Sequence, residues 1–198
     1  MEPRAFDEAR AASFLTRVIE DHAASMTVFL CALGDRLGLF TALAEAGPAT
    51  SAELAEGAGV HERYAREWLA GLHAAGYVAR DDGERYSLPR EHHPTLLKEG
   101  HPFFQGHFHE QITGLYPMFE PVCAAFRSGD GVADEQYPDH FDRGLERATR
   151  IWVDRFLTTM WLPGLPDVHQ RLTDGAGVAD VGCGAGLATR KMAEAYPE

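Results

Sequence analysis

Long apolar runs and basic residues are both scarce in this chain of 198 residues. No apolar stretch approaches the roughly 20 residues that a membrane-spanning helix needs. Charges also interrupt residues 1–25, where a secretory signal peptide would be apolar. Lysine and arginine number 18 against 30 acidic residues, which gives a formal net charge of -12. Since phosphate contacts depend on Lys and Arg, this balance argues against nucleic acid as a partner, and we expect a soluble, cytoplasmic protein.

Cysteine is also sparse, with three residues, Cys31, Cys123 and Cys183. Their number is odd, they lie far apart, and no two of them have the short spacing of a metal-binding pair. This pattern argues against a disulfide framework and fits a reducing compartment.

The N-terminal part of the sequence has the apolar spacing of helices. Apolar residues recur at three- and four-residue steps over residues 6–46, which predicts two helices with a break near residues 33–34 or at Gly38. The segment GPATSAELAEGAGV then predicts a short helix with Thr50 or Ser51 as its N-cap and Gly57-Ala58-Gly59 as its end.

A fourth helix and a hairpin complete this region. HERYAREWLAGLHAAGYV carries Tyr64, Trp68, Leu69 and Leu72 on one helical face. YVARDDGERYSL then holds two short alternating runs around an Asp82-Gly83 turn, which is a hairpin signal. Two helices, a short helix, another helix and a hairpin are in the order of a winged helix, and we assign this domain to residues 1–90.

The N-terminal helices also hold more apolar residues than a small domain can bury internally. A surplus of this kind indicates a contact surface, and it predicts a homodimer formed through these helices. The residues concerned are Met26, Val28, Phe29, Leu30, Leu33, Leu37 and Phe40.

Residues 91–174 form a linker or substrate-cap region that is again helical, with Gly and Pro between its segments. Helices are predicted near 102–112, 115–127, 143–161 and 166–172. The aromatic residues in its first half suit either an apolar acceptor pocket or the core; they are Phe103, Phe104, Phe108, Tyr116 and Phe119.

The last segment, residues 175–198, changes character. GVADV predicts a strand over 177–181, glycines follow, and LATRKMAEAY predicts a helix. In such a unit the missing Cβ atoms let a ligand lie close to the backbone at the helix N-terminus. The pattern is D-x-G-x-G-x-G, with Asp180 leading Gly182, Gly184 and Gly186, and it lacks the third glycine of a dinucleotide fingerprint. Because a carboxylate repels phosphate, Asp180 favours a neutral or cationic ligand.

Three segments together carry a resemblance to known enzymes. VADVGCGAGLATRKMAEAYP resembles motif I of class I S-adenosylmethionine-dependent methyltransferases. LGDRLGLFTALAEAGPATSAELAEGAGVHERYAREWLAGLHAAGYV resembles the N-terminal winged helix of one bacterial family of them, and LERATRIWVDRFLTTMWLPGL is similar to its connecting region. The resemblance implies a mainly α winged-helix domain and a helical linker. The first strand and helix of an incomplete α/β Rossmann-like methyltransferase domain follow.

The activity that the resemblance implies is methyl transfer from S-adenosylmethionine to a small-molecule acceptor. Asp180 matches the acidic position that faces the methionine amino group, and Gly182, Gly184 and Gly186 match the glycines under the cofactor. Cys183 matches a position where family members often carry cysteine. Methyl transfer needs in-line alignment and no enzyme nucleophile, so no catalytic residue is assigned.

The family pattern is broken after the glycine turn. Its next landmark is a second strand ending in an acid for the ribose hydroxyls, and further strands complete a seven-stranded sheet; neither follows Gly186 here. We therefore expect an N-terminal portion, truncated just after motif I and inactive alone.

Two further hypotheses concern other chemistry. A winged-helix transcriptional regulator is the alternative function, although Arg63 and Arg66 stand beside Glu62 and Glu67, which leaves no net positive face. A metal site at His101, His107 and His109 is not expected, since on a helix His107 and His109 point to nearly opposite faces. These histidines suit a core or solvated position, or a general base for a hydroxyl acceptor.

Overall fold

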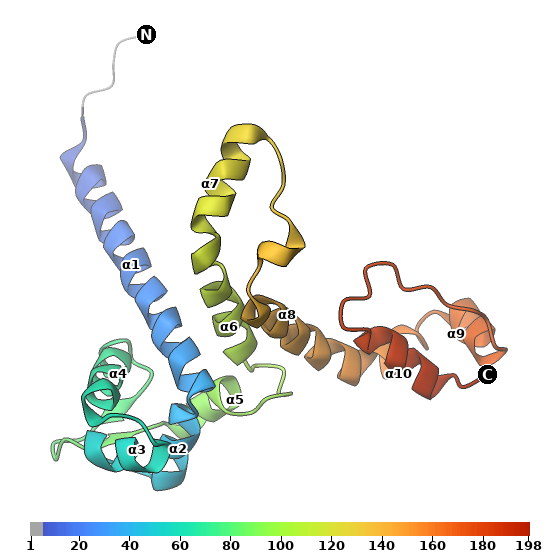
Figure 1. The fold of residues 1–198 in the computed structure, drawn as a ribbon. Coiled ribbons are helices and arrows are strands. Elements are labelled where there is room, and N and C mark those ends of the chain that lie inside the picture. Colours follow the sequence, from blue (N-terminus) through green and yellow to red (C-terminus); the bar gives the residue numbers. More distant parts are fainter. Residues whose placement is uncertain (1–5) are drawn as a thin grey trace. The chain divides into compact units, whose positions relative to one another are not determined.

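The computed structural model describes residues 6–198 (Figure 1). The chain divides into two compact units, Met1–Leu97 and Lys98–Glu198, and each is described by itself. Within the described residues no single helix is both long and apolar enough to cross a membrane, although the first two helices, bent by 72°, pass such a test together by length and composition alone.

The first unit is a helical domain with one hairpin. Its helices are α1 (Glu8–Arg36), α2 (Leu39–Ala46), α3 (Ser51–Ala58), α4 (Glu62–Ala74), the 3-10 turn η1 (Arg90–His92) and α5 (His93–Leu96). Strands β1 (Ala79–Arg80) and β2 (Tyr86–Ser87) pair antiparallel between α4 and η1 (Figure 1). The predicted order is confirmed. The break between α1 and α2 lies at Gly38, whose φ of 67° is the left-handed conformation that glycine tolerates.

Local hydrogen bonds explain where α3 and the hairpin form. Thr50 accepts from the backbone N–H of Glu53, and the Glu53 carboxylate accepts from the backbone N–H of Thr50 at 2.7 Å, which together make a capping box. Arg85 of the hairpin donates to the same carboxylate at 2.8 Å. These bonds, the backbone bond from Thr50 first, lower the pKa of Glu53. Asp81 closes the turn by accepting from the backbone of Gly83 and Arg85, both at 2.9 Å.

The core of this unit forms where α1, α2 and α4 meet. Trp68 is 3% exposed, packs edge-on against Phe40 with ring centroids 5.0 Å apart, and donates its N–H to the Leu30 carbonyl at 2.9 Å. Cys31 lies in the same core, and burial raises the pKa of its thiol to about 12. Phe40, expected at a dimer surface, is 2% exposed and belongs to this core. Its ring packs so close to α1 that a Cβ on Gly34 would lie 2.6 Å from it.

The second unit is helical throughout its ordered elements. These are α6 (Gly106–Gly114), η2 (Tyr116–Met118), α7 (Phe119–Ser128), η3 (Asp134–Gln136), α8 (Asp139–Trp152), η4 (Val153–Trp161), α9 (Pro166–Thr173) and α10 (Leu187–Ala195). The four helices predicted for the linker are present with shifted bounds. The helix expected over 143–161 begins earlier, at Asp139, and continues from Val153 as the π-helix η4. Its i,i+5 spacing stacks Phe156 on Trp161 with centroids 6.0 Å apart.

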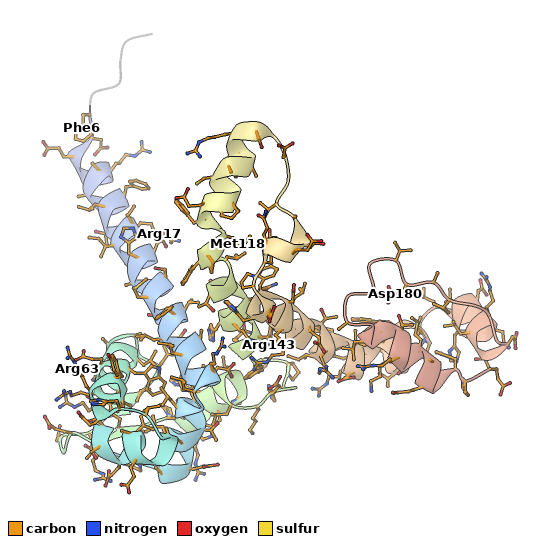
Figure 2. The ribbon with its side chains drawn as sticks, viewed as in Figure 1. Phe6, Arg17, Arg63, Met118, Arg143 and Asp180 are labelled. Atoms are coloured by element: carbon orange, nitrogen blue, oxygen red, sulfur yellow. The ribbon has the colours of Figure 1, made fainter. Side chains whose placement is uncertain are left out.

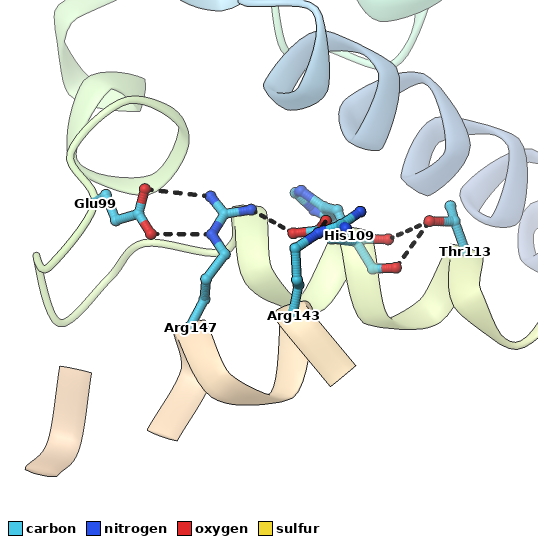
Figure 3. Close-up of polar contacts among 6 residues, drawn as sticks. Glu99, His109, Thr113, Arg143 and Arg147 are labelled. Carbon is cyan, nitrogen blue, oxygen red and sulfur yellow. Dashed lines mark hydrogen bonds and ion pairs between the residues drawn. The ribbon is translucent and has the colours of Figure 1, made fainter. Parts of the chain in front are cut away.

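Helices α6 and α8 pack closely because glycines face their partner at two points. A Cβ on Gly144 would lie 2.8 Å from the backbone of α6, and one on Gly114 would lie 2.8 Å from the Cβ of Phe141. Ion pairs support this contact (Figure 3): Glu110, 16% exposed, pairs with Arg147 at 2.7 Å and with Arg143 at 3.2 Å. The pairs fix α8, and with it one wall of the site described below.

The strand expected over residues 177–181 does not form. The structure has helix α10 where expected, but residues 176–180 are neither helix nor strand, and Val181 is 97% exposed. A strand exists through its pairing with a neighbour. Among the described residues of this unit there is no second strand to pair with.

Candidate functional site

The glycine turn has an unusual backbone conformation, and the space around its glycines is open. Gly182, Gly184 and Gly186 have φ values of 78°, 52° and 70°, in the left-handed region that disfavours side chains. A Cβ on any of them would meet nothing within 4 Å. These glycines therefore serve the backbone conformation and leave room for a ligand, and close packing within the protein does not require them.

Asp180 stands at the entrance to this turn (Figure 2). Its Oδ2 accepts a hydrogen bond from the Thr189 hydroxyl of α10 at 3.0 Å. Cys183 is exposed, and its thiol donates to the Gly184 carbonyl at 3.6 Å. Gly186 closes the turn by donating to the Cys183 carbonyl at 2.9 Å, and it is the N-cap of α10.

Contacts of α10 hold the turn in place. Leu187, the first residue of α10, is 6% exposed, and the helix packs on η4. Lys191 of α10 pairs with Asp154 of η4 at 3.2 Å. Beyond the helix, the Tyr196 hydroxyl hydrogen-bonds His169 of α9 at 2.8 Å. The turn is thus fixed without a neighbouring strand.

A cleft of about 1100 Å³ opens between this turn and the start of α8. Of the five residues predicted for the site, Asp180, Gly182, Cys183 and Gly184 line the cleft, and Gly186 does not. The opposite wall is formed by the η3 region and α8, and it includes Tyr137, Phe141, Asp142, Leu145, Glu146 and Thr149.

The wall on α8 was not predicted from the sequence. Phe141, Leu145 and Thr149 follow one another at four-residue steps, so they share one face of α8, and Tyr137 lies just before this helix, at the end of η3. The rings of Tyr137 and Phe141 lie 4.9 Å apart. The spacing was a signal for an amphipathic face, but nothing local says that this face meets the glycine turn.

The cleft is strongly acidic. Its charged lining comprises Asp134, Asp139, Asp142, Glu146, Asp180 and a single base, Arg143. Arg143 is paired with Glu110, and Glu146 is paired with Arg150. The remaining negative charge attracts a cation and repels phosphate.

The histidines singled out in the sequence lie elsewhere. His107 is 3% exposed on α6 and packs between Phe104 and Phe108, with ring centroids 5.8 and 4.4 Å away. His101, His107 and His109 are absent from the lining of the cleft. Within the described part of the chain, no group of three His, Cys, Asp or Glu side chains is placed to hold a metal ion.

Comparison with known proteins identifies the first unit. Residues 24–98 match the family model of the Rv2258c-like winged HTH domain, so the N-terminal domain is a winged helix. No curated protein sequence matches the chain.

Solved methyltransferases share the fold of both units. Human N-acetylserotonin methyltransferase, in complex with SAM, is 19% identical with a TM-score of 0.61, covering 99% of this chain and 59% of its own. PigF with SAH is 22% identical with a TM-score of 0.59, and the match covers 92% of this chain and 56% of PigF. An O-methyltransferase from neocarzinostatin biosynthesis, in complex with S-adenosyl-L-homocysteine and 1,4-dihydroxy-2-naphthoic acid, is 19% identical with a TM-score of 0.57, covering 91% and 56%. The chain therefore spans less than two thirds of the length of each.

Proposed function

We propose that the chain supplies the winged helix, the helical linker and one wall of the cofactor site of an S-adenosylmethionine-dependent methyltransferase for a small-molecule acceptor. The observation that carries this proposal is the acidic cleft under the glycine turn. Methyl transfer is proposed for the extended protein, in which residues 1–198 are followed by the segment that completes the methyltransferase fold. Residues 175–198 then form the first strand and helix of that Rossmann-like domain.

The residues of the cleft fit this cofactor. S-adenosylmethionine supplies an electrophilic methyl group on a sulfonium, and it also carries an ammonium group. In this proposal the Asp180 carboxylate, which lines the cleft, accepts hydrogen bonds from that ammonium, and the acidic lining favours both cationic groups. Gly182 and Gly184 line the cleft and let the cofactor approach the backbone, and Gly186 closes the turn behind them as the N-cap of α10.

The chain's other residues have supporting roles. Tyr137 and Phe141 offer an apolar surface beside the glycine turn, which suits an apolar part of the acceptor. At about 1100 Å³ the cleft is slightly larger than the roughly 300–1000 Å³ typical of ligand pockets, which leaves room for a cofactor and part of an acceptor. Cys183 takes no step in the reaction.

Calorimetry with S-adenosylhomocysteine tests this function. The extended protein is expected to bind the compound, because the ligand keeps the ammonium and the adenosine of the cofactor and cannot react. At about 1 mM ligand, even a weak site with a binding free energy of only about -4 kcal/mol would be half filled. Absence of heat up to that concentration would therefore reject the proposal.

The winged helix is not expected to bind DNA, because Arg66 of α4 and both arginines of the hairpin are paired with acids. Arg80 pairs with Glu84 and Arg85 with Glu53, each at 2.8 Å, on the hairpin. On α4, Arg66 pairs with Glu62 at 3.7 Å, and the exposed Arg63 (Figure 2) directly follows that same acid in the sequence. We predict no shift of a duplex in a gel at low salt, where nonspecific phosphate binding is strongest. A shift whose strength falls steeply with salt would favour the regulator instead.

Helix α1 is proposed to form a homodimer with a second copy. Its exposed residues include Phe14 at 70%, Leu15 at 59%, Ile19 at 58% and Met26 at 59%. A stripe of this kind is costly in water. Sedimentation is expected to give a dimer at micromolar concentration and a monomer for Leu15→Glu/Ile19→Glu.

The matched control places the same two charges on the other side of α1. Ser13 and Ala24 lie about half a helical turn from Leu15 and Ile19. The Ser13→Glu/Ala24→Glu variant should remain dimeric. Monomeric wild-type protein at tens of micromolar, or equal behaviour of the two variants, would contradict the proposed interface.

A further inference from the structure

The hydroxyl of Thr189 behaves differently from those of six other helical threonines in this chain. Where threonines lie inside helices, the hydroxyl commonly donates to the carbonyl four residues earlier in the same helix. Six threonines do so here: Thr16, Thr27, Thr113, Thr149, Thr159 and Thr173. Thr189 instead donates across the glycine turn to Oδ2 of Asp180, nine residues earlier, at 3.0 Å.

The position of Thr189 in α10 explains this difference. It is the third residue of the helix, so the residue four positions earlier, Ala185, belongs to the turn and not to α10. Gly182, Gly184 and Gly186, all with positive φ, reverse the chain and bring the first turn of α10 back to Asp180. The same turn that opens space for a ligand therefore also brings a hydroxyl donor to the carboxylate.

Asp180 has no competing charged partner among the residues that the structure describes. Among the described residues, no Lys or Arg forms an ion pair with it, and Lys191 on the same helix is held by Asp154 at 3.2 Å. The Thr189 hydroxyl occupies Oδ2, and no donor within the described chain reaches Oδ1. A fixed carboxylate with one oxygen available can accept a hydrogen bond from a ligand cation without first leaving a protein partner.

We propose that Thr189 is a positioning residue that orients the Asp180 carboxylate toward the ammonium group of the cofactor. This rests on the proposed function of the cleft. Thr189 itself does not touch the ligand. It holds the side-chain torsions of Asp180, so that the conformational freedom of the carboxylate is lost on folding rather than on binding.

Two variants of Thr189 separate the effect of its hydroxyl from the effect of its side-chain shape. Thr189→Val keeps the size and branching at Cβ and removes the donor, while Thr189→Ser keeps the donor. Thr173→Val is the matched control, because the Thr173 hydroxyl donates only to the His169 carbonyl of its own helix α9. In the extended protein, Thr189→Val is expected to weaken S-adenosylhomocysteine binding about tenfold, the loss of one hydrogen bond to a charged group. Thr189→Ser and Thr173→Val should stay within about twofold of wild type, close to measurement error.

A second ligand distinguishes positioning from general damage to the site. 5′-Methylthioadenosine keeps the adenosine and the sulfur but lacks the ammonium that Asp180 is proposed to hold. Thr189→Val should leave its affinity unchanged, and on an Asp180→Asn background the Thr189→Val change should have little further effect on either ligand. An equal loss for both ligands would overturn the positioning role.

The outcomes separate this inference from the function on which it rests. If wild-type extended protein binds neither ligand, the cofactor site itself is rejected. If the wild type binds S-adenosylhomocysteine and Thr189→Val binds it equally well, the site stands and the positioning role is rejected. A Thr189→Val protein that loses its thermal unfolding transition is replaced by Thr189→Ala, for which the same ligand comparison applies.

Discussion

Asp180→Ala in the extended protein is expected to weaken S-adenosylhomocysteine binding by about 100-fold, which places it beyond detection in an ordinary calorimetric titration. A hydrogen bond to a charged group contributes about 1.5–3 kcal/mol, and every 1.4 kcal/mol is about a tenfold change in affinity. The upper part of this range applies because the ligand ammonium would be left in the cleft without its partner.

Gly184→Val should have an effect of the same size for a different reason. The φ of 52° at Gly184 disfavours any side chain, and the added atoms would occupy the open space where the ligand lies. Gly129→Val is the matched control, because Gly129 also has a positive φ, of 83°, and open space around it, but ends α7 and does not line the cleft. If Gly129→Val and Gly184→Val weaken binding equally, the effect is one of backbone strain and not of the site.

Residues 1–198 alone should show no binding in the same titration. The glycine turn and Asp180 make only one wall, and in the resembled family the acid for the ribose hydroxyls lies beyond motif I. Two or three missing hydrogen bonds of about 1–3 kcal/mol each weaken binding by a few hundredfold or more. Micromolar affinity of this chain would instead show that α8 and the η3 region make most of the contacts.

The parts of the fold that were predictable are those set by local signals. The Thr50-x-x-Glu53 pattern marks its own helix start, Gly38 marks a helix break, and Asp82-Gly83 lies in the turn of the hairpin, because each depends on atoms a few residues away. The winged helix followed from the order of these local elements.

The errors lie where distant residues decide the structure. GVADV has the composition of a strand, but a strand needs a neighbour, and the described residues supply none. Phe40 has the spacing of a surface stripe on the N-terminal helices, yet Trp68, 28 positions away along the sequence, covers it.

The same limit applies to the site. The glycines and Asp180 were visible as a motif, because all of them lie within one short segment of the sequence. The wall carrying Tyr137 and Phe141 is brought to the motif by the η3 region and α8, and only the helical spacing of the α8 residues was visible in the sequence. The cofactor residues themselves stay predictions until binding is measured.

Gly144→Ala is expected to loosen the packing of α6 on α8 and to raise amide hydrogen exchange in both helices. The new Cβ would lie 2.8 Å from the backbone N of Gln111 and from the His107 carbonyl oxygen, so the helices must move apart. Overpacking of this kind costs about 1–3 kcal/mol, which would speed exchange through local opening by about 5- to 150-fold. The shift also lengthens the ion pairs from Glu110 to Arg143 and Arg147, which support the same contact (Figure 3).

The control for this change is Gly131→Ala, since a Cβ at Gly131 meets nothing within 4 Å and its φ is not positive. Exchange at α3 and α4 serves as the reference within each sample. Because Phe141 sits on α8 and lines the cleft, Gly144→Ala should also weaken ligand binding in the extended protein, whereas Gly131→Ala should not. Unchanged exchange in α6 and α8 would mean that the two helices approach less closely in solution, and that the cleft wall does not depend on Gly144.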